Sequence, residues 1–158
     1  MKVPLLKLGR RRKGNAMIEF AIACSLLIPA FSATFQFGYT LYQYNLVCAA
    51  ITNGARYAAS RTYRTLSGGA DITKGKLATK NLVVYGIPSG GTVPQVKGLT
   101  TGNVNVTYTT TATGIPKTVI VSISNFTIDG IFKSYTFNSA PTLEYPYIGR
   151  YAPEESEP

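Results

Sequence analysis

The chain has 158 residues, enough for one small domain and an extension. Its net charge of +9 is of the size found in nucleic-acid-binding proteins, but six of the 16 basic residues lie within the first 13 positions. From residue 15 onward ten basic residues face seven acidic ones, with no basic helix or aromatic-basic motif among them. We therefore predict no nucleic-acid partner.

The chain contains no histidine and only two cysteines, Cys24 and Cys48. Histidine-based catalytic triads are excluded and a zinc site lacks ligands, so we predict no metal and no cofactor. On one helix the two cysteines would lie about 36 Å apart at ~1.5 Å per residue, far beyond the ~7 Å limit for a disulfide. Cys24 is predicted to be a small apolar residue, whereas Cys48 is either a free thiol or a link between subunits.

Residues 1–14 are predicted to form a short basic leader, in which Pro4 and Gly9 disfavour a stable helix. Its last basic residues are Arg10, Arg11, Arg12 and Lys13. A charged region ahead of an apolar segment is typical of targeting, and the lysine and arginine bias predicts a cytoplasmic location for it. The C-terminal part is then predicted to be exported.

Met17 to Phe37 is an apolar run of about the ~20 residues that cross a bilayer as a helix. Pro29 removes one backbone donor within it and predicts a kink. Tyr39, Tyr42 and Tyr44 follow, as expected for an aromatic belt at the headgroups. We predict a helix that spans the membrane to about residue 38.

Glu19 is the only charged residue between Lys13 and Arg56. A carboxylate within a membrane span costs roughly 2.5–3.5 kcal/mol on insertion scales, so such an acid normally has a partner. Cleavage after Gly14 would create an α-amine on Asn15, four residues from Glu19 and on the same helix face. The amine of one chain would then neutralise Glu19 of a neighbour and set the register between stacked subunits. The alternative is that Glu19 only favours the positive helix N-terminus and reaches the interface.

A second processing site competes with Gly14. Ala30-Phe31-Ser32 has small residues where a conventional signal peptidase requires them, and cleavage there would leave Ala33 first. Glu19 would then lie inside the apolar region of a signal peptide, which disfavours this alternative.

Helical spacing continues beyond the apolar run, so we predict one helix from residue 15 to about 61. One face carries residues at three- and four-residue steps: Tyr39, Tyr42, Leu46, Ala49, Asn53 and Tyr57. Gly54-x-x-x-Ala58 permits close approach of another backbone. The residues predicted to pack are Gly54, Ala55, Arg56, Tyr57 and Ala58. Their partner is either the chain's own C-terminal domain or neighbouring subunits.

The remaining chain predicts a short helix and several strands. Residues 65–71 and 87–102 are predicted loops, which flank a helix from Ile72 to Tyr85 that Gly86 ends. Alternation then predicts a strand through Val104, Val106 and Tyr108, a turn at Gly114-Ile115-Pro116, and a strand through Val119, Val121 and Ile123. Phe126 and Ile128 have the opposite parity, which predicts a bulge or a change of face near Asn125. Tyr135 to Tyr147 is a third extended segment, and Pro141 makes it an edge strand or two short strands.

The predicted fold class is α+β, with a long N-terminal transmembrane helix, a short helix and a small antiparallel sheet. The predicted parts are the leader 1–14, the long helix 15–61, an exported head 62–152 and a disordered acidic tail 153–158. About 45 residues of β structure are marginal alone, so the short helix and the distal half of the long one should cover one face.

Gly14-Asn-Ala-Met-Ile-Glu19-Phe20 resembles the prepilin cleavage motif of type IV pilins and pseudopilins, a basic leader ending in glycine with glutamate as the fifth mature residue. More specifically, the chain resembles the TadE-like minor pseudopilins of the tight-adherence (Flp) pilus system. The resemblance is carried by Met17-Ile-Glu-Phe-Ala21, a proline in the apolar run, Phe37-Gly-Tyr, Tyr42 to Asn45 and Gly54-Ala-Arg-Tyr-Ala-Ala59. Lys80 to Gly86, Gly98-Leu99 and the late β segments resemble that family more loosely.

The resemblance implies a single-pass protein of the bacterial inner membrane, with a cytoplasmic N-terminus and a periplasmic head. A prepilin peptidase would cleave between Gly14 and Asn15, and Glu19 and Phe20 would be assembly positions. The mature protein would take part in assembly or initiation of a thin pilus for surface attachment and could enter the extracellular pilus. Its partners would be other pilins or pseudopilins and the assembly machinery.

Two other functions compete with this one. The chain could be a signal-anchored binding or adhesin domain outside the cytoplasm, without pilus assembly. It could also be an exported enzyme, with Asp129 and Glu144 as the only candidate carboxylate pair. We predict that it is not an enzyme.

Overall fold

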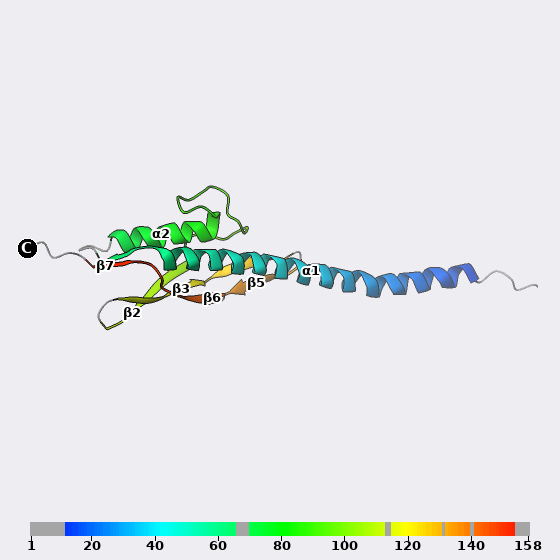
Figure 1. The fold of residues 1–158 in the computed structure, drawn as a ribbon. Helices are drawn as coiled ribbons and strands as arrows, with labels where there is room; N and C mark the ends of the chain where they lie inside the picture. The colour runs from blue at the N-terminus through cyan, green and yellow to red at the C-terminus, as the bar shows by residue number, and fades with distance from the viewer. Residues whose placement is uncertain (1–11, 66–69, 113–114, 131, 140, 154–158) are drawn as a thin grey trace, which may run out of the picture. The chain divides into compact units, whose positions relative to one another are not determined.

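The computed structural model describes residues 12–65, 70–112, 115–130, 132–139 and 141–153 (Figure 1). The chain forms two compact units, Met1–Gly38 and Tyr39–Pro158. Most of the predicted leader and residues 154–158 of the predicted tail lie outside the described residues, whereas Pro153, its first residue, belongs to a strand. The predicted α+β class is confirmed, since a long helix and a short helix accompany small sheets.

α1, Arg12–Ser60, is a single helix of 49 residues. It begins at Arg12 rather than at residue 15, so Gly14 and Asn15 lie in its first turn. One glycine costs only about 1 kcal/mol relative to alanine in a helix, which the run that follows readily offsets. The helix remains continuous through Pro29 and ends one residue before the predicted position, at Ser60.

α2, Ala70–Tyr85, starts two residues before the predicted Ile72 and ends where the sequence predicted. Gly86 adopts a φ of +76°, and its N–H donates to the carbonyl of Leu82 over 2.9 Å. This is the left-handed C-terminal cap that glycine favours, because it has no Cβ to clash.

Among the described residues, the β structure forms three small sheets instead of the one that was predicted. The largest is antiparallel in the order β2-β3-β6, built from Val104–Thr110, Pro116–Ile123 and Thr142–Pro146. A second antiparallel pair joins β4, Phe126–Asp129, to β5, Ser134–Phe137. The third pair is parallel and joins β1, Tyr63–Thr65, to β7, Tyr151–Pro153. Pairing over three residues leaves no periodicity in the sequence, so this pair was not predicted.

The chain changes sheet at Asn125, as the change of parity predicted. Asn125 has a φ of 51°, a left-handed conformation that asparagine tolerates better than most residues. The Asn103 side chain donates to the carbonyls of Ser124 and Asn125 over 3.2 Å and 2.8 Å and holds this corner. Farther along, the chain around Pro141 separates β5 from β6, which confirms the alternative of two short strands.

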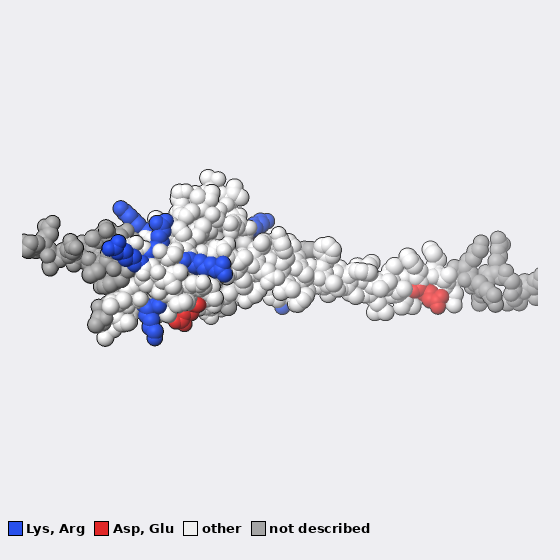
Figure 2. Space-filling view, in the orientation of Figure 1, with Lys and Arg blue, Asp and Glu red and all other residues white. Residues whose placement is uncertain are grey.

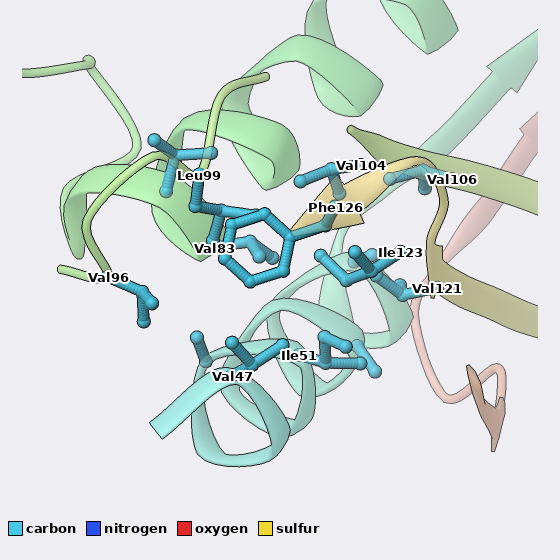
Figure 3. Close-up of a cluster of buried hydrophobic side chains, with 14 of the residues drawn as sticks. Val47, Ile51, Val83, Val96, Leu99, Val104, Val106, Val121, Ile123 and Phe126 are labelled. Atoms are coloured by element: carbon cyan, nitrogen blue, oxygen red, sulfur yellow. The ribbon is translucent and has the colours of Figure 1, made fainter. Parts of the chain in front are cut away.

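One hydrophobic core lies between the distal half of α1, α2 and the sheets (Figure 3). Val47 and Ile51 enter it from α1, Val83 enters from α2, and Phe126 enters from β4. The β2-β3-β6 sheet adds Val104, Val106, Val119, Val121 and Ile123. The two helices therefore cover the β structure, as its small size required.

Gly54 lies at a close contact between α1 and α2. A Cβ added there would collide with Cγ2 of Val83, a fully buried side chain, and would also meet Thr79. Ala50, Ala55, Ala58 and Ala59 are buried on the same stripe. The small residues of α1 therefore pack within the chain's own head.

We expect Gly54→Ala to destabilise the protein. Overpacking costs typically 1–3 kcal/mol, and the gain in helix propensity offsets up to ~1 kcal/mol, so the expected net loss is about 1–2 kcal/mol. Thermal unfolding of the full chain in detergent measures it. Gly75→Ala is the matched control, because Gly75 lies in α2 with nothing within 4 Å of an added Cβ. Equal or higher stability of Gly54→Ala would show that the helix contact is looser than described.

Candidate functional site

The first unit presents a helix that is apolar on all sides. Ten large apolar side chains are 53–73% exposed there: Met17, Ile18, Phe20, Ile22, Leu26, Leu27, Ile28, Phe31, Phe35 and Phe37. Soluble monomers rarely expose an apolar surface of this extent. Gly14–Ser60 contains an 18-residue window apolar enough to cross a membrane, and none of that window is buried within the chain. The single apolar helix fits a membrane anchor.

Glu19 stands on the exposed surface of this helix. Figure 2 shows acidic atoms on an otherwise uncharged stretch of α1. Gly14, Asn15 and Phe20 are exposed as well, and Asn15 precedes Glu19 by four residues, or about one helical turn. Arg12 and Lys13 belong to the same helix, whereas Arg10 and Arg11 lie outside the described residues. The bond between Gly14 and Asn15 is therefore part of helical backbone.

The predicted packing residues divide between two environments. Gly54, Ala55 and Ala58 are buried against the head, whereas Arg56 is exposed. Tyr57 is half-buried, and the Arg61 guanidinium lies 4.4 Å from the centre of its ring and donates to its hydroxyl. Within this chain, the small residues of the segment pack against the chain's own C-terminal domain. Of the five predicted packing residues, Arg56 is the one that is exposed.

Residues 14–56 match the model of a protein family described as TadE-like protein. This segment of the chain is therefore similar to TadE-like proteins. The match runs from Gly14 to Arg56 and includes Asn15, Glu19 and the apolar run. No curated protein and no solved structure matched the chain. The family implies a protein associated with the tight-adherence pilus.

Beyond the TadE-like segment, the head has a cavity of about 470 Å³ between the C-terminal end of α1 and the first half of α2. Its lining is Tyr57, Ser60, Arg61, Thr62, Lys74, Gly75 and Ala78. These residues contribute cations and hydroxyls but no carboxylate, thiol or imidazole. The cavity was not predicted, because its two walls are separate in the sequence and meet only when α2 packs on α1.

The carboxylate pair considered from the sequence lies on different sheets. Asp129 ends β4 and accepts a hydrogen bond from Ser134 Oγ over 3.0 Å. Glu144 lies in β6 opposite Ile120 of β3. Within the part of the chain that the structure describes, no group of three or more histidine, cysteine, aspartate or glutamate residues is placed to hold a metal ion. The expectation that the protein is not an enzyme stays a prediction.

Both cysteines of the TadE-like segment are free in this chain and partly exposed. A side-chain hydrogen bond with Cys48 raises the pKa of Tyr44. The Tyr44 ring also lies 5.6 Å from that of Phe137 in β5. A link between subunits through Cys48 stays a prediction.

We expect charge placed in the apolar run to prevent stable membrane integration. Leu27→Lys combined with Ile28→Lys adds an insertion cost on the order of 6 kcal/mol, because each lysine at the centre of a span costs about 3 kcal/mol. Retention of the full chain in membranes after alkaline carbonate extraction measures the loss. Leu77→Lys with Ile87→Lys is the control, since both residues are 54% exposed in the head and Leu27 is 53% exposed. Equal retention of the two double variants would argue against a span centred on Leu27.

Proposed function

We propose that the protein is a minor pseudopilin, processed by a prepilin peptidase, that takes part in assembly or initiation of a tight-adherence pilus for surface attachment. The observation that carries this proposal is a solitary, exposed Glu19, four residues after Asn15 in the segment that matches the TadE-like family. The protein would cross the inner membrane once, with its N-terminus in the cytoplasm and its head in the periplasm. Other pilins or pseudopilins and the assembly machinery would be its partners.

The chemistry of assembly follows from one pair of charges. Cleavage after Gly14 frees the α-amine of Asn15, which is protonated at neutral pH because its ordinary pKa is about 7.7–8.0. Glu19 in lipid costs roughly 2.5–3.5 kcal/mol unless a cation reaches it, and no lysine or arginine occurs from residue 14 to 55. A neighbouring subunit that places its amine beside Glu19 removes this cost. The pairing would hold only at one axial offset, so it also selects the register.

Removal of the leader also permits the subunit to leave the bilayer. The leader carries Lys2, Lys7, Arg10, Arg11, Arg12 and Lys13. Each cation would cost about 2.5–3.5 kcal/mol at the membrane centre, so an uncleaved chain is held at the cytoplasmic face. Cleavage replaces six side-chain charges with one amine that has a dedicated partner. Processing would therefore have to precede incorporation.

The alternative function is a signal-anchored binding or adhesin domain that does not assemble. One observation favours this alternative: Gly54, Ala55 and Ala58 are buried in the chain's own head. Because they are buried, these small residues are not available to pack against the helix of a neighbouring subunit. The lone acid in the apolar helix favours assembly, since a plain anchor has no use for it.

Processing gives the first test of this proposal. We expect N-terminal sequencing of the mature protein to begin at Asn15, and Gly14→Val to leave the precursor uncleaved because the added side chain blocks the peptidase. Gly38→Val is the control, since an added Cβ at Gly38, as at Gly14, has nothing within 4 Å. A mature chain beginning at Ala33 would indicate secretion, and an intact Met1 would indicate a plain anchor.

Substitution of Glu19 gives the second test. We expect Glu19→Ala to be cleaved normally but to reduce piliation strongly, because the amine of the neighbour loses its partner; Glu19→Asp should restore part of it. Pilus counts by electron microscopy and surface attachment measure the effect. Glu144→Gln is the control, an exposed acid of the head whose loss should leave piliation unchanged. Normal pili with Glu19→Ala would exclude an assembly role for this residue.

A further inference from the structure

We propose that the head binds the lipid headgroup layer through a juxtamembrane patch of aromatic and basic side chains. The exposed residues that we assign to the patch are Tyr39, Tyr42, Lys97, Phe132, Lys133 and Tyr135. Tyr39 and Lys97 border one cavity with Ile128, Ile128 pairs with Tyr135, and Lys133 lies beside the Tyr135 ring. The proposal rests on the membrane anchoring of the apolar run and adds a second, reversible attachment of the head to the same bilayer.

Contacts along α1 place the turn between β4 and β5 at one end of the head. Near the C-terminal end of α1, Ala58 accepts a hydrogen bond from Tyr108 of β2 over 3.4 Å. Farther toward the N-terminus, Tyr44 packs on Phe137 of β5 at 5.6 Å between ring centres. A cavity of about 40 Å³ is lined by Tyr39 and Gln43 together with Ile128 and Asp129, the last residues of β4. The strands therefore run toward Tyr39, and their turn lies at that end.

The covalent chain keeps this end near the membrane surface. Tyr39 follows the apolar run by two residues, which span at most ~7 Å of extended chain. This limit holds for any orientation of the head relative to the preceding unit. Tyr39 itself therefore lies at the level of the headgroups when residues 17–37 cross the bilayer, and the proposal is that the side chains near it reach the same layer.

The composition of the patch suits a membrane interface. Phe132 is 67% exposed, Tyr42 is 58% exposed and Tyr135 is 41% exposed, although all three are large aromatic residues. Lys133 Nζ lies 5.7 Å from the centre of the Tyr135 ring, and Lys97 borders the same cavity as Tyr39. Aromatic rings enter the boundary between headgroups and acyl chains, and lysine ammonium groups pair with lipid phosphates.

The acid of this region does not oppose that binding. Asp129 accepts a hydrogen bond from Ser134 Oγ. Asp129 and Lys97 line the same cavity. The patch itself carries two lysines and no acid, so it is complementary to anionic phosphate. We therefore favour lipid over a second protein subunit as the occupant.

The test uses the full chain reconstituted in vesicles of phosphatidylethanolamine and phosphatidylglycerol. Both native cysteines are changed to alanine, and Phe132→Cys carries an environment-sensitive fluorophore. Ile115→Cys is the matched probe, because Ile115 is 44% exposed and lies beside the turn that joins β2 to β3, at the Ala58 end of the head. We expect a blue-shifted emission and quenching by headgroup-labelled lipid at position 132, and neither at position 115.

Two further arms separate the possible failures. A fluorophore at Leu27→Cys reports whether the apolar run lies in lipid. If lipid does not quench this probe, the anchoring proposal fails. If lipid quenches the probe at position 27 but not the one at position 132, only the patch proposal is overturned. Protection of position 132 that appears only at high protein-to-lipid ratio would indicate a subunit contact and would also overturn it. Lys97→Glu with Lys133→Glu should lower the ratio of bound to unbound head at least roughly thirtyfold in anionic vesicles, because each lysine near the surface contributes about 1 kcal/mol. Lys74→Glu with Lys117→Glu, away from the patch, should leave that ratio unchanged.

Discussion

A single carboxylate in an apolar helix is the constraint from which the N-terminal half of this protein is best understood. Apart from the donor that Pro29 lacks, the backbone of α1 satisfies its own hydrogen bonds, as a helix in lipid must. Glu19 needs a cationic partner, because no lysine or arginine occurs between it and Arg56. The α-amine that cleavage would create at Asn15 lies about 6 Å away along the helix axis, at ~1.5 Å per residue. The acid and the amine are therefore about one helical turn apart on each chain.

The same helix meets two different environments along its length. In its first half the large apolar side chains are exposed on every side, as suits lipid. In its second half burial is confined to one stripe at helical spacing: Val47, Ala50, Ile51, Gly54, Ala55, Ala58 and Ala59. Small residues on that stripe let α2 approach closely, and Val83 occupies the space that a side chain at position 54 would take. One continuous helix thus carries an exposed apolar segment and a stripe that packs into the core of the head.

Most local features could be predicted, because they depend on residues near one another in the sequence. The alternation of Val104, Val106 and Tyr108 predicted β2, and Gly86 predicted the end of α2. α1 begins three residues before the approximate start that was predicted, since neither Lys13 nor Gly14 prevents a helix once a long run follows it. Of the candidate site, Gly14, Asn15 and Glu19 were predicted from the basic cluster, the glycine and the lone acid, and their roles stay predictions. The cavity beside Arg61 and Lys74 was not found, because it exists only where two helices meet.

The amino-acid sequence by itself determined the apolar helix, its lone acid, the α+β class and the resemblance to TadE-like proteins, since these reside in periodicity, charge and short motifs. Only the tertiary structure decided which surface covers Gly54, how the strands divide into three sheets, and that the β4–β5 turn lies near Tyr39. The pairing of Tyr63 with Tyr151 is the clearest instance. Contacts between distant residues depend on which of many competing surfaces packs best, and no local pattern records that outcome.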